Sequence, residues 1–130
     1  MRILQPPDWV RPKGYSNGIA ARGETIYVAG QVGWNGEERF EHEGLVEQAG
    51  QALKNIVQIL EQAKARPEHL VRLTWYISDA QEYLTNQKAL GAVYRKVIGA
   101  HFPAMSVIEV KGFIEDGANL EIEAIAVVPD

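Results

Sequence analysis

The chain has 130 residues, of which 46% are hydrophobic and 23% charged, a balance typical of a folded domain rather than a disordered chain. Its net charge of −4 comes without any block of basic residues, which argues against nucleic acid and anionic membranes as partners. There is no cysteine, so disulfides and thiolate chemistry are excluded. No stretch resembles a signal peptide or a membrane span, and we expect a cytoplasmic protein with a single domain over residues 1–130.

The first third of the chain predicts a lead-in followed by two strands. Residues 1–14 should be irregular, because they contain Pro6, Pro7, Pro12 and Gly14. Two β-prone runs, residues 15–21 and 25–31, flank Arg22-Gly23-Glu24, and this spacing predicts a tight antiparallel hairpin. The glycines and polar residues of 33–38 predict a loop.

A helix is the best-defined element that follows. Its apolar residues recur at steps of three and four: Leu45, Ala49, Ala52, Leu53, Ile56, Val57, Leu60 and Ala63. Arg66-Pro67 should end it, and bulky residues on both sides of 71–77 then predict a strand. A second helix fits residues 81–99, with Gly99 at its end, and strands are expected at 105–111 and 119–127.

The predicted order is therefore ββαβαββ, an α+β chain with a mixed sheet and two helices on one face. The last strand is apolar on both sides, however. Leu120, Ile122, Ala124, Ala126 and Val128 lie on one side, and Ile125 and Val127 on the other. Because no third helix is available to cover the second face, we expect another subunit to cover it in a closed oligomer.

Most of the usual catalytic constellations are absent from the sequence. It has no phosphate-binding glycine loop, no metal-spaced His/Cys cluster and no nucleophile elbow, and His42, His69 and His101 are isolated. Glu121 and Glu123 share one side of the final strand, where they either are solvated or paired at a rim, or position and activate water. Trp34 and Trp75 are candidates for an aromatic cleft, although we interpret Trp75 as a packing residue.

Five short segments stand in a recognisable series between Gly14 and Val128. They are GYSN at 14–17, IYVAGQV at 26–32, QALKNI at 51–56, FPAMS at 102–106 and LEIEAIA at 120–126. In this order and spacing they resemble the Rid/YjgF family.

The resemblance implies a chorismate-mutase-like fold and a homotrimer whose sheets form a central barrel, with three small-molecule clefts between subunits. It also implies hydrolysis of reactive enamines and imines, such as 2-aminoacrylate, to a ketoacid and ammonia without a cofactor. Carried onto this chain, Tyr15 matches the cleft tyrosine and Glu121 the carboxylate that positions water. Gly30 and Val107 match positions whose backbone lines the ligand site.

Met105 departs from the family pattern, because the deaminating branch has at this position an arginine that holds the substrate carboxylate. A thioether cannot form that bidentate pair, and its loss weakens binding by about two to three orders of magnitude. Ala29 and Val107 stand where that branch often has serine and cysteine, so the cleft walls are more apolar. The cations that could replace the arginine are Lys13, Arg72, Arg95 and Lys111.

Two functional hypotheses follow from these residues. The first is a deaminase acting on an enamine or imine other than 2-aminoacrylate, with Tyr15 and Glu121 handling proton transfer and water, and Gly30, Met105 and Val107 contacting the ligand. The second is a non-catalytic, small-molecule-binding or regulatory trimer, which the loss of the arginine favours. The ribonuclease activity ascribed to some relatives does not fit the acidic balance of the chain.

Overall fold

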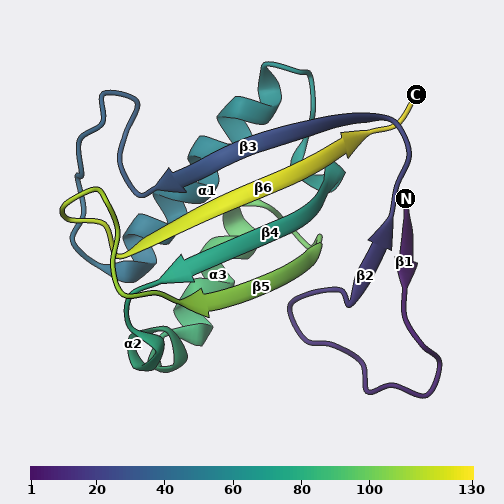
Figure 1. The fold of residues 1–130 in the computed structure, drawn as a ribbon, viewed down its shortest axis with the longest axis horizontal. Helices are drawn as coiled ribbons and strands as arrows, with labels where there is room; N and C mark the ends of the chain where they lie inside the picture. The colour runs from purple at the N-terminus through teal and green to yellow at the C-terminus, as the bar shows by residue number, and fades with distance from the viewer.

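The computed structural model describes residues 1–130 and contains a four-stranded mixed sheet (Figure 1). The strands are β3 (Glu24–Val32), β4 (Leu70–Ile77), β5 (Ala104–Glu109) and β6 (Leu120–Val128). In the order β3-β6-β4-β5, β6 runs antiparallel to both of its neighbours, and β4 and β5 are parallel. The predicted mixed sheet and α+β class are confirmed.

Helices α1 (Leu45–Glu61) and α3 (Gln87–Val97) cover the same face of this sheet, and both lie behind it in Figure 1. The short helix α2 (Ala80–Thr85) precedes α3, and a 3-10 turn (Pro67–His69) leads into β4. None of these helices combines the length and the apolar run that crossing a membrane requires.

The prediction of one continuous second helix over 81–99 is wrong, because the helix breaks at Asn86. The backbone of Asn86 leaves the helical region (φ −108°, ψ 16°), and its side-chain amide donates to the Glu82 carbonyl at 2.8 Å. Asparagine competes in this way with helical hydrogen bonds. The predicted end is correct, because Gly99 follows the last turn of α3 with φ 97°.

The core lies between the sheet and the two covering helices, and it contains the predicted apolar face of α1. Its largest fully buried side chains include Leu53, Ile56, Leu60, Leu70, Leu73, Leu120 and Ile122. Side chains of β6 alternate between this core and the opposite face, as the period of two predicts.

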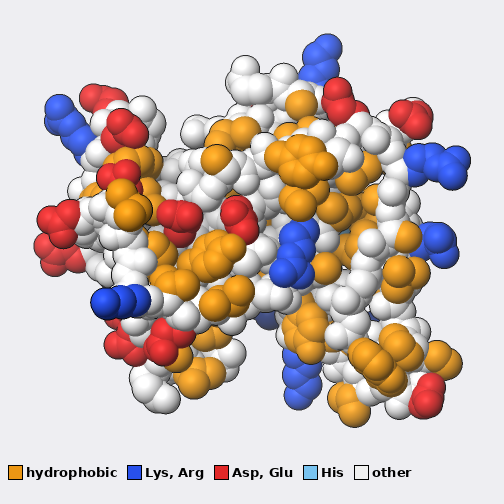
Figure 2. Space-filling view, in the orientation of Figure 1, with side chains coloured by type: hydrophobic (Ala, Val, Ile, Leu, Met, Phe, Trp, Pro, Cys, Tyr) orange, Lys and Arg blue, Asp and Glu red, His pale blue; other side chains and the backbone are white.

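The opposite face of the sheet has no helix over it. Figure 2 looks onto this face and shows hydrophobic side chains exposed among charged ones. Tyr27 is 77% exposed there, Arg72 donates to the Ser106 hydroxyl at 3.0 Å, and the Tyr76 hydroxyl donates to Glu123 at 2.7 Å. The sequence therefore correctly predicted one covered and one uncovered face.

The N-terminal region differs from the prediction. Residues 1–14 were expected to be irregular, but β1 (Arg2–Leu4) forms a separate two-stranded sheet with β2 (Gly18–Ala20). Residues 15–21 therefore contain only a short strand, and it does not form a hairpin with β3.

The reason lies at Gly23, which turns the chain from one sheet into the other. Gly23 has φ 142°, and a Cβ at this position would overlap the Val128 carbonyl. Glu24 pairs with Val128, so β6 takes the place beside β3 that the hairpin prediction gave to residues 15–21.

Candidate ligand-binding site

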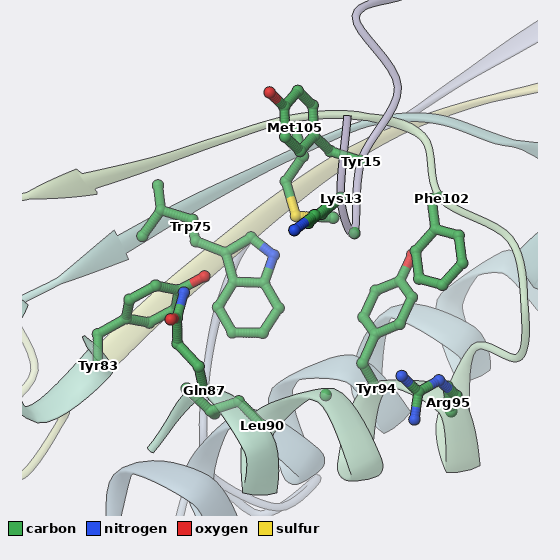
Figure 3. A pocket seen from close by; sticks show the side chains of 13 residues that line it. Lys13, Tyr15, Trp75, Tyr83, Gln87, Leu90, Tyr94, Arg95, Phe102 and Met105 are labelled. Carbon is green, nitrogen blue, oxygen red and sulfur yellow. The ribbon is translucent and has the colours of Figure 1, made fainter. Parts of the chain in front are cut away.

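A cavity of about 460 Å³ lies between the β5 edge of the sheet and helix α3 (Figure 3). Its walls come from β4 and β5, from α2 and α3, and from the segment that precedes β2. Small-molecule sites in proteins commonly have volumes of roughly 300–1,000 Å³. The cavity is therefore large enough for a metabolite.

Three of the five predicted site residues line this cavity: Tyr15, Met105 and Val107. The two residues of β5 pair with Leu73 and Trp75 of β4, so their side chains lie on the face that the helices cover.

Tyr15 is held at the cavity by the residue that follows it. The Ser16 amide donates to the Pro103 carbonyl at 3.0 Å, and the Ser16 hydroxyl donates to the Phe102 carbonyl at 2.6 Å. Ser16 also forms a parallel bridge with Ala104, at the start of β5. These bonds fasten the N-terminal segment to the edge of the sheet, although the Tyr15 side chain itself stays 41% exposed.

Aromatic side chains form much of the remaining wall. Tyr94 stacks on Phe102 with ring centroids 5.6 Å apart, and its hydroxyl donates to the His101 carbonyl at 2.6 Å. Trp75 meets Tyr83 edge to face with centroids 6.5 Å apart. Burial raises the pKa of Tyr94, and it raises the pKa of Tyr83 against the smaller opposing effect of a hydrogen bond with Gln87, so both phenols are neutral at pH 7.

Trp75 packs in the core, as predicted, but it also lines the cavity. The sequence did not identify Tyr83, Tyr94 or Phe102 as wall residues, because an aromatic side chain on the inner side of a helix or strand looks the same whether it fills a core or borders a cavity. Trp34, the other predicted cleft residue, instead contacts Phe40 with centroids 5.6 Å apart.

Of the four cations considered from the sequence, Lys13 and Arg95 line the cavity. Arg72 lies on the uncovered face of the sheet, where it contacts Ser106, and Lys111 follows β5 and does not contribute to the cavity wall.

The other two predicted site residues, Gly30 and Glu121, lie together elsewhere. The Glu121 carboxylate lies so close over Gly30 that a Cβ at position 30 would overlap it. Glu121 pairs with Tyr76 of β4, and its side chain lies on the uncovered face of the sheet. Glu123 lies on the same face, as predicted, and its hydrogen bond with Tyr76 is the main cause of the raised pKa of that phenol.

A buried glutamine that the sequence analysis did not single out holds the end of the sheet at which β6 begins, next to Glu121. The Gln48 amide donates to the carbonyls of His42 at 3.0 Å and Gly117 at 2.8 Å, and its oxygen accepts from the Asn119 amide at 2.8 Å. These bonds fix the loop that leads into β6 directly before Glu121. The sequence signal that could have identified Gln48 is its position, because it is a polar residue on the otherwise apolar side of α1.

The predicted site residues thus form two groups within one chain. Tyr15, Met105 and Val107 lie on the covered face at the β5 edge, whereas Gly30 and Glu121 lie on the uncovered face, with β4 between β5 and β6. A single chain does not bring Tyr15 and Glu121 to one ligand.

Comparisons with known proteins agree on one family. The family model described as Endoribonuclease L-PSP matches residues 10–128. The human 2-iminobutanoate/2-iminopropanoate deaminase is 31% identical over 104 residues, covering 79% of this chain and 72% of the relative. A RutC family protein of Aquifex aeolicus is 34% identical over 131 residues, covering 98% and 99% of the two chains. Among solved structures, the Rid family protein YyfB of Yersinia pestis has a TM-score of 0.85 at 29% identity, with 98% of each chain covered.

The chain has an α+β fold with a cavity at the edge of its sheet, and the family model matches almost the whole length of the chain. The fold and this match define the class of protein. The chain belongs to the Rid/YjgF family. The resemblance of the five sequence segments is confirmed, and relatives of this chain are named as imine deaminases.

Proposed function

We propose that the chain forms a homotrimer that binds small molecules in clefts between subunits and hydrolyses an enamine or imine other than 2-aminoacrylate. An imine and water give a carbonyl compound and ammonia, and an enamine first becomes the imine by protonation at carbon. No cofactor takes part in this reaction.

The division of the predicted site within one chain carries this proposal. Tyr15 borders an open cavity at the β5 edge, and Glu121 lies on a sheet face that no helix covers. A second copy that packs on this face can bring its own Glu121 and Gly30 to the Tyr15 side of its neighbour. Rings of identical subunits form such heterologous contacts when the rotation closes.

Each group then has a chemical role in the cleft. The Glu121 carboxylate accepts a proton from the attacking water, which adds to the carbon of the C=N bond. The Tyr15 hydroxyl binds the nitrogen, which takes the proton from Glu121 to complete a carbinolamine. The C–N bond then breaks as the carbinolamine hydroxyl becomes the carbonyl group, and the proton of that hydroxyl passes through Glu121 to the leaving nitrogen, which departs as ammonia. The tight contact between Gly30 and Glu121 fixes the direction of that carboxylate.

Met105 sets the proposed substrate apart from the 2-aminoacrylate that the resemblance to the deaminating branch implies. It lines the cavity with an uncharged thioether, which cannot hold a small carboxylate as an arginine does. A substrate larger or less anionic than 2-aminoacrylate therefore fits this cavity better.

Ammonia release from a panel of enzymatically generated enamines and imines tests the activity. Wild type should release ammonia from at least one member, and Glu121→Ala should lose this activity while its mass stays near three times the 14.5 kDa chain. Glu123→Gln is the matched control, because it keeps an acceptor for Tyr76 on the same face and should retain turnover. Equal activity in wild type and Glu121→Ala would contradict the assigned role.

A second function, non-catalytic binding or regulation, is favoured by one observation: Met105 in place of the arginine. It predicts a trimer that binds small molecules but releases ammonia from no member of the panel.

A further inference from the structure

A groove of about 630 Å³ lies between the loop that joins β1 to β2 and the segment that leads from α3 into β5. Its apolar walls include Ile3 and Trp9, whose side chains stay 66% and 61% exposed. Figure 2 shows hydrophobic side chains gathered over this N-terminal part of the molecule, at the lower right. A small-molecule site encloses most of its ligand, so walls as open as these fit a protein surface better.

The groove also carries positive charge without a compensating acid. Arg11 lines it, and no aspartate or glutamate does. The one ion pair in the structure joins Arg66 and Glu68, so Arg11 has no acidic partner within the chain. Tryptophan, tyrosine and arginine are the side chains that most often dominate binding at protein interfaces. Trp9, Tyr15 and Arg11 all line this groove.

Hydrogen bonds close the loop that forms the groove. The Asn17 side-chain amide donates to the Gln5 side-chain oxygen at 2.8 Å, and the backbone amide of Trp9 donates to the Pro6 carbonyl at 3.2 Å. Trp9 is therefore presented by a closed turn rather than by a free chain end. A surface that is already ordered loses less conformational entropy when a partner binds.

A surface complementary to this groove lies in the loop of residues 110–119, which joins β5 to β6. Ile114 in this loop is 99% exposed, the highest value among the large hydrophobic side chains. The next two residues, Glu115 and Asp116, are exposed and acidic. The hydrogen bonds of Gln48 hold the end of the loop, so this apolar and acidic tip also stands on a fixed base.

We propose that the 110–119 loop of one subunit inserts into the N-terminal groove of the next subunit in the ring. Ile114 packs in the apolar part of the groove against Trp9, and Glu115 pairs with Arg11. Figure 1 shows this loop at the left of the sheet and β1 and β2 at the right, so a single chain does not bring the two surfaces together. Contacts between two different surfaces of identical subunits close into rings when the rotation permits.

The inference rests on the proposed function for the ring itself, and it adds a contact beside the shared site. Tyr15 lines both the groove and the cavity at the β5 edge. Glu121 lies two residues beyond the loop, a reach of at most about 7 Å along the chain. A rotation that brings Glu121 of one subunit to Tyr15 of the next therefore also carries the loop toward the groove. The inserted loop then holds in place the N-terminal segment that presents Tyr15.

Sedimentation of the full-length protein over a dilution series tests this contact. Ile114→Ser should raise the concentration at which half of the protein is assembled by about tenfold to a hundredfold, because the burial of a large apolar side chain is lost. Arg11→Glu should raise it by about tenfold, because it places like charges together, and adding Glu115→Arg should restore assembly. Ile59→Ser and Lys54→Glu, two exposed positions on α1, are the matched controls and should leave assembly unchanged.

Wild-type assembly in both Ile114→Ser and Arg11→Glu would overturn the proposal, and so would a charge reversal that Glu115→Arg does not rescue.

A second measurement locates the contact directly, and the absence of cysteine from the chain makes it specific. The double variant Ile3→Cys with Ile114→Cys keeps small apolar side chains at both positions. Treated with a short bis-maleimide, it should give covalent dimers and trimers on a denaturing gel. Ile3→Cys with Ile59→Cys is the control and should stay monomeric on that gel. Monomers alone from the first pair would overturn the proposal.

This contact and the deaminase activity can fail separately. Cross-linked trimers that release no ammonia from any substrate would remove the deaminase and keep the interface. Ammonia release by a protein whose assembly is unchanged in Ile114→Ser and Arg11→Glu would keep the deaminase and remove the loop contact.

Discussion

Replacing Gln48 by alanine should lower the free energy of unfolding, because Gln48 holds the loops at the end of the sheet where Glu121 lies. Gln48 is fully buried and makes three hydrogen bonds, to the carbonyls of His42 and Gly117 and from the amide of Asn119. Each such bond contributes about 1 kcal/mol net, and the truncated side chain leaves space in the core, so we expect a loss of about 2–4 kcal/mol. Urea unfolding at a fixed protein concentration should show the midpoint fall by about 1–2 M, given a slope of roughly 2 kcal/mol/M.

Gln58→Ala is the matched control, because Gln58 lies on the exposed side of the same helix. Its unfolding free energy should stay within about 0.5 kcal/mol of wild type. A Gln48→Ala protein that unfolds at the wild-type urea concentration would show that these three bonds contribute nothing to stability, and would refute the reasoning.

Three further predictions concern the site and its walls. Gly30→Ala should push the Glu121 carboxylate aside and lower ammonia release by roughly a hundredfold, as misplacing a reacting group by about 1 Å does, whereas Gly112→Ala, where a Cβ meets no atom, should leave the rate unchanged. Met105→Arg should gain hydrolysis of 2-aminoacrylate if the arginine that holds the substrate carboxylate is the one part of the site that this chain lacks. An ammonia assay that shows no gain would mean that the shape of the cavity differs as well. Burial raises the pKa of Tyr94, so the folded state favours the neutral phenol. Tyr94 therefore contributes its full share of folding stability below about pH 10, and this share is lost as the pH rises further, because the phenol then ionises more readily in the unfolded chain. Tyr94→Phe should therefore be less stable than wild type by about 1 kcal/mol at pH 7, with the gap narrowing above pH 10 in thermal melts, and a constant gap would contradict the assignment.

The regular parts of the fold could be predicted because their side-chain periods are strong. The apolar spacing of α1 from Leu45 to Leu60 and the alternation along β6 both match the structure. The prediction of an N-terminal hairpin is wrong because the pattern of a strand does not show which other strand it pairs with. The partner of β3 is β6, which is distant in the sequence. The break at Asn86 depends on one local hydrogen bond, which periodicity does not register.

The site could be predicted only in part, and by resemblance rather than by pattern. Tyr15, Met105 and Val107 are brought together at one cavity, and Gly30 contacts Glu121. What the sequence could not show is that these groups lie on opposite faces of the sheet. Nor could it select Lys13 and Arg95 from four candidate cations, because that choice depends on how the N-terminal segment and α3 fold against β5.

Mixing two inactive variants tests the shared site most directly. Tyr15→Phe and Glu121→Ala should each fail to release ammonia alone, but refolding them together in equal amounts forms mixed trimers. An intact site then needs Tyr15 from one subunit and Glu121 from its neighbour, which random assembly provides at about one quarter of the clefts. Recovery of about a quarter of wild-type ammonia release is the result we predict, and no recovery in trimers shown by mass spectrometry to be mixed would contradict a site shared between subunits.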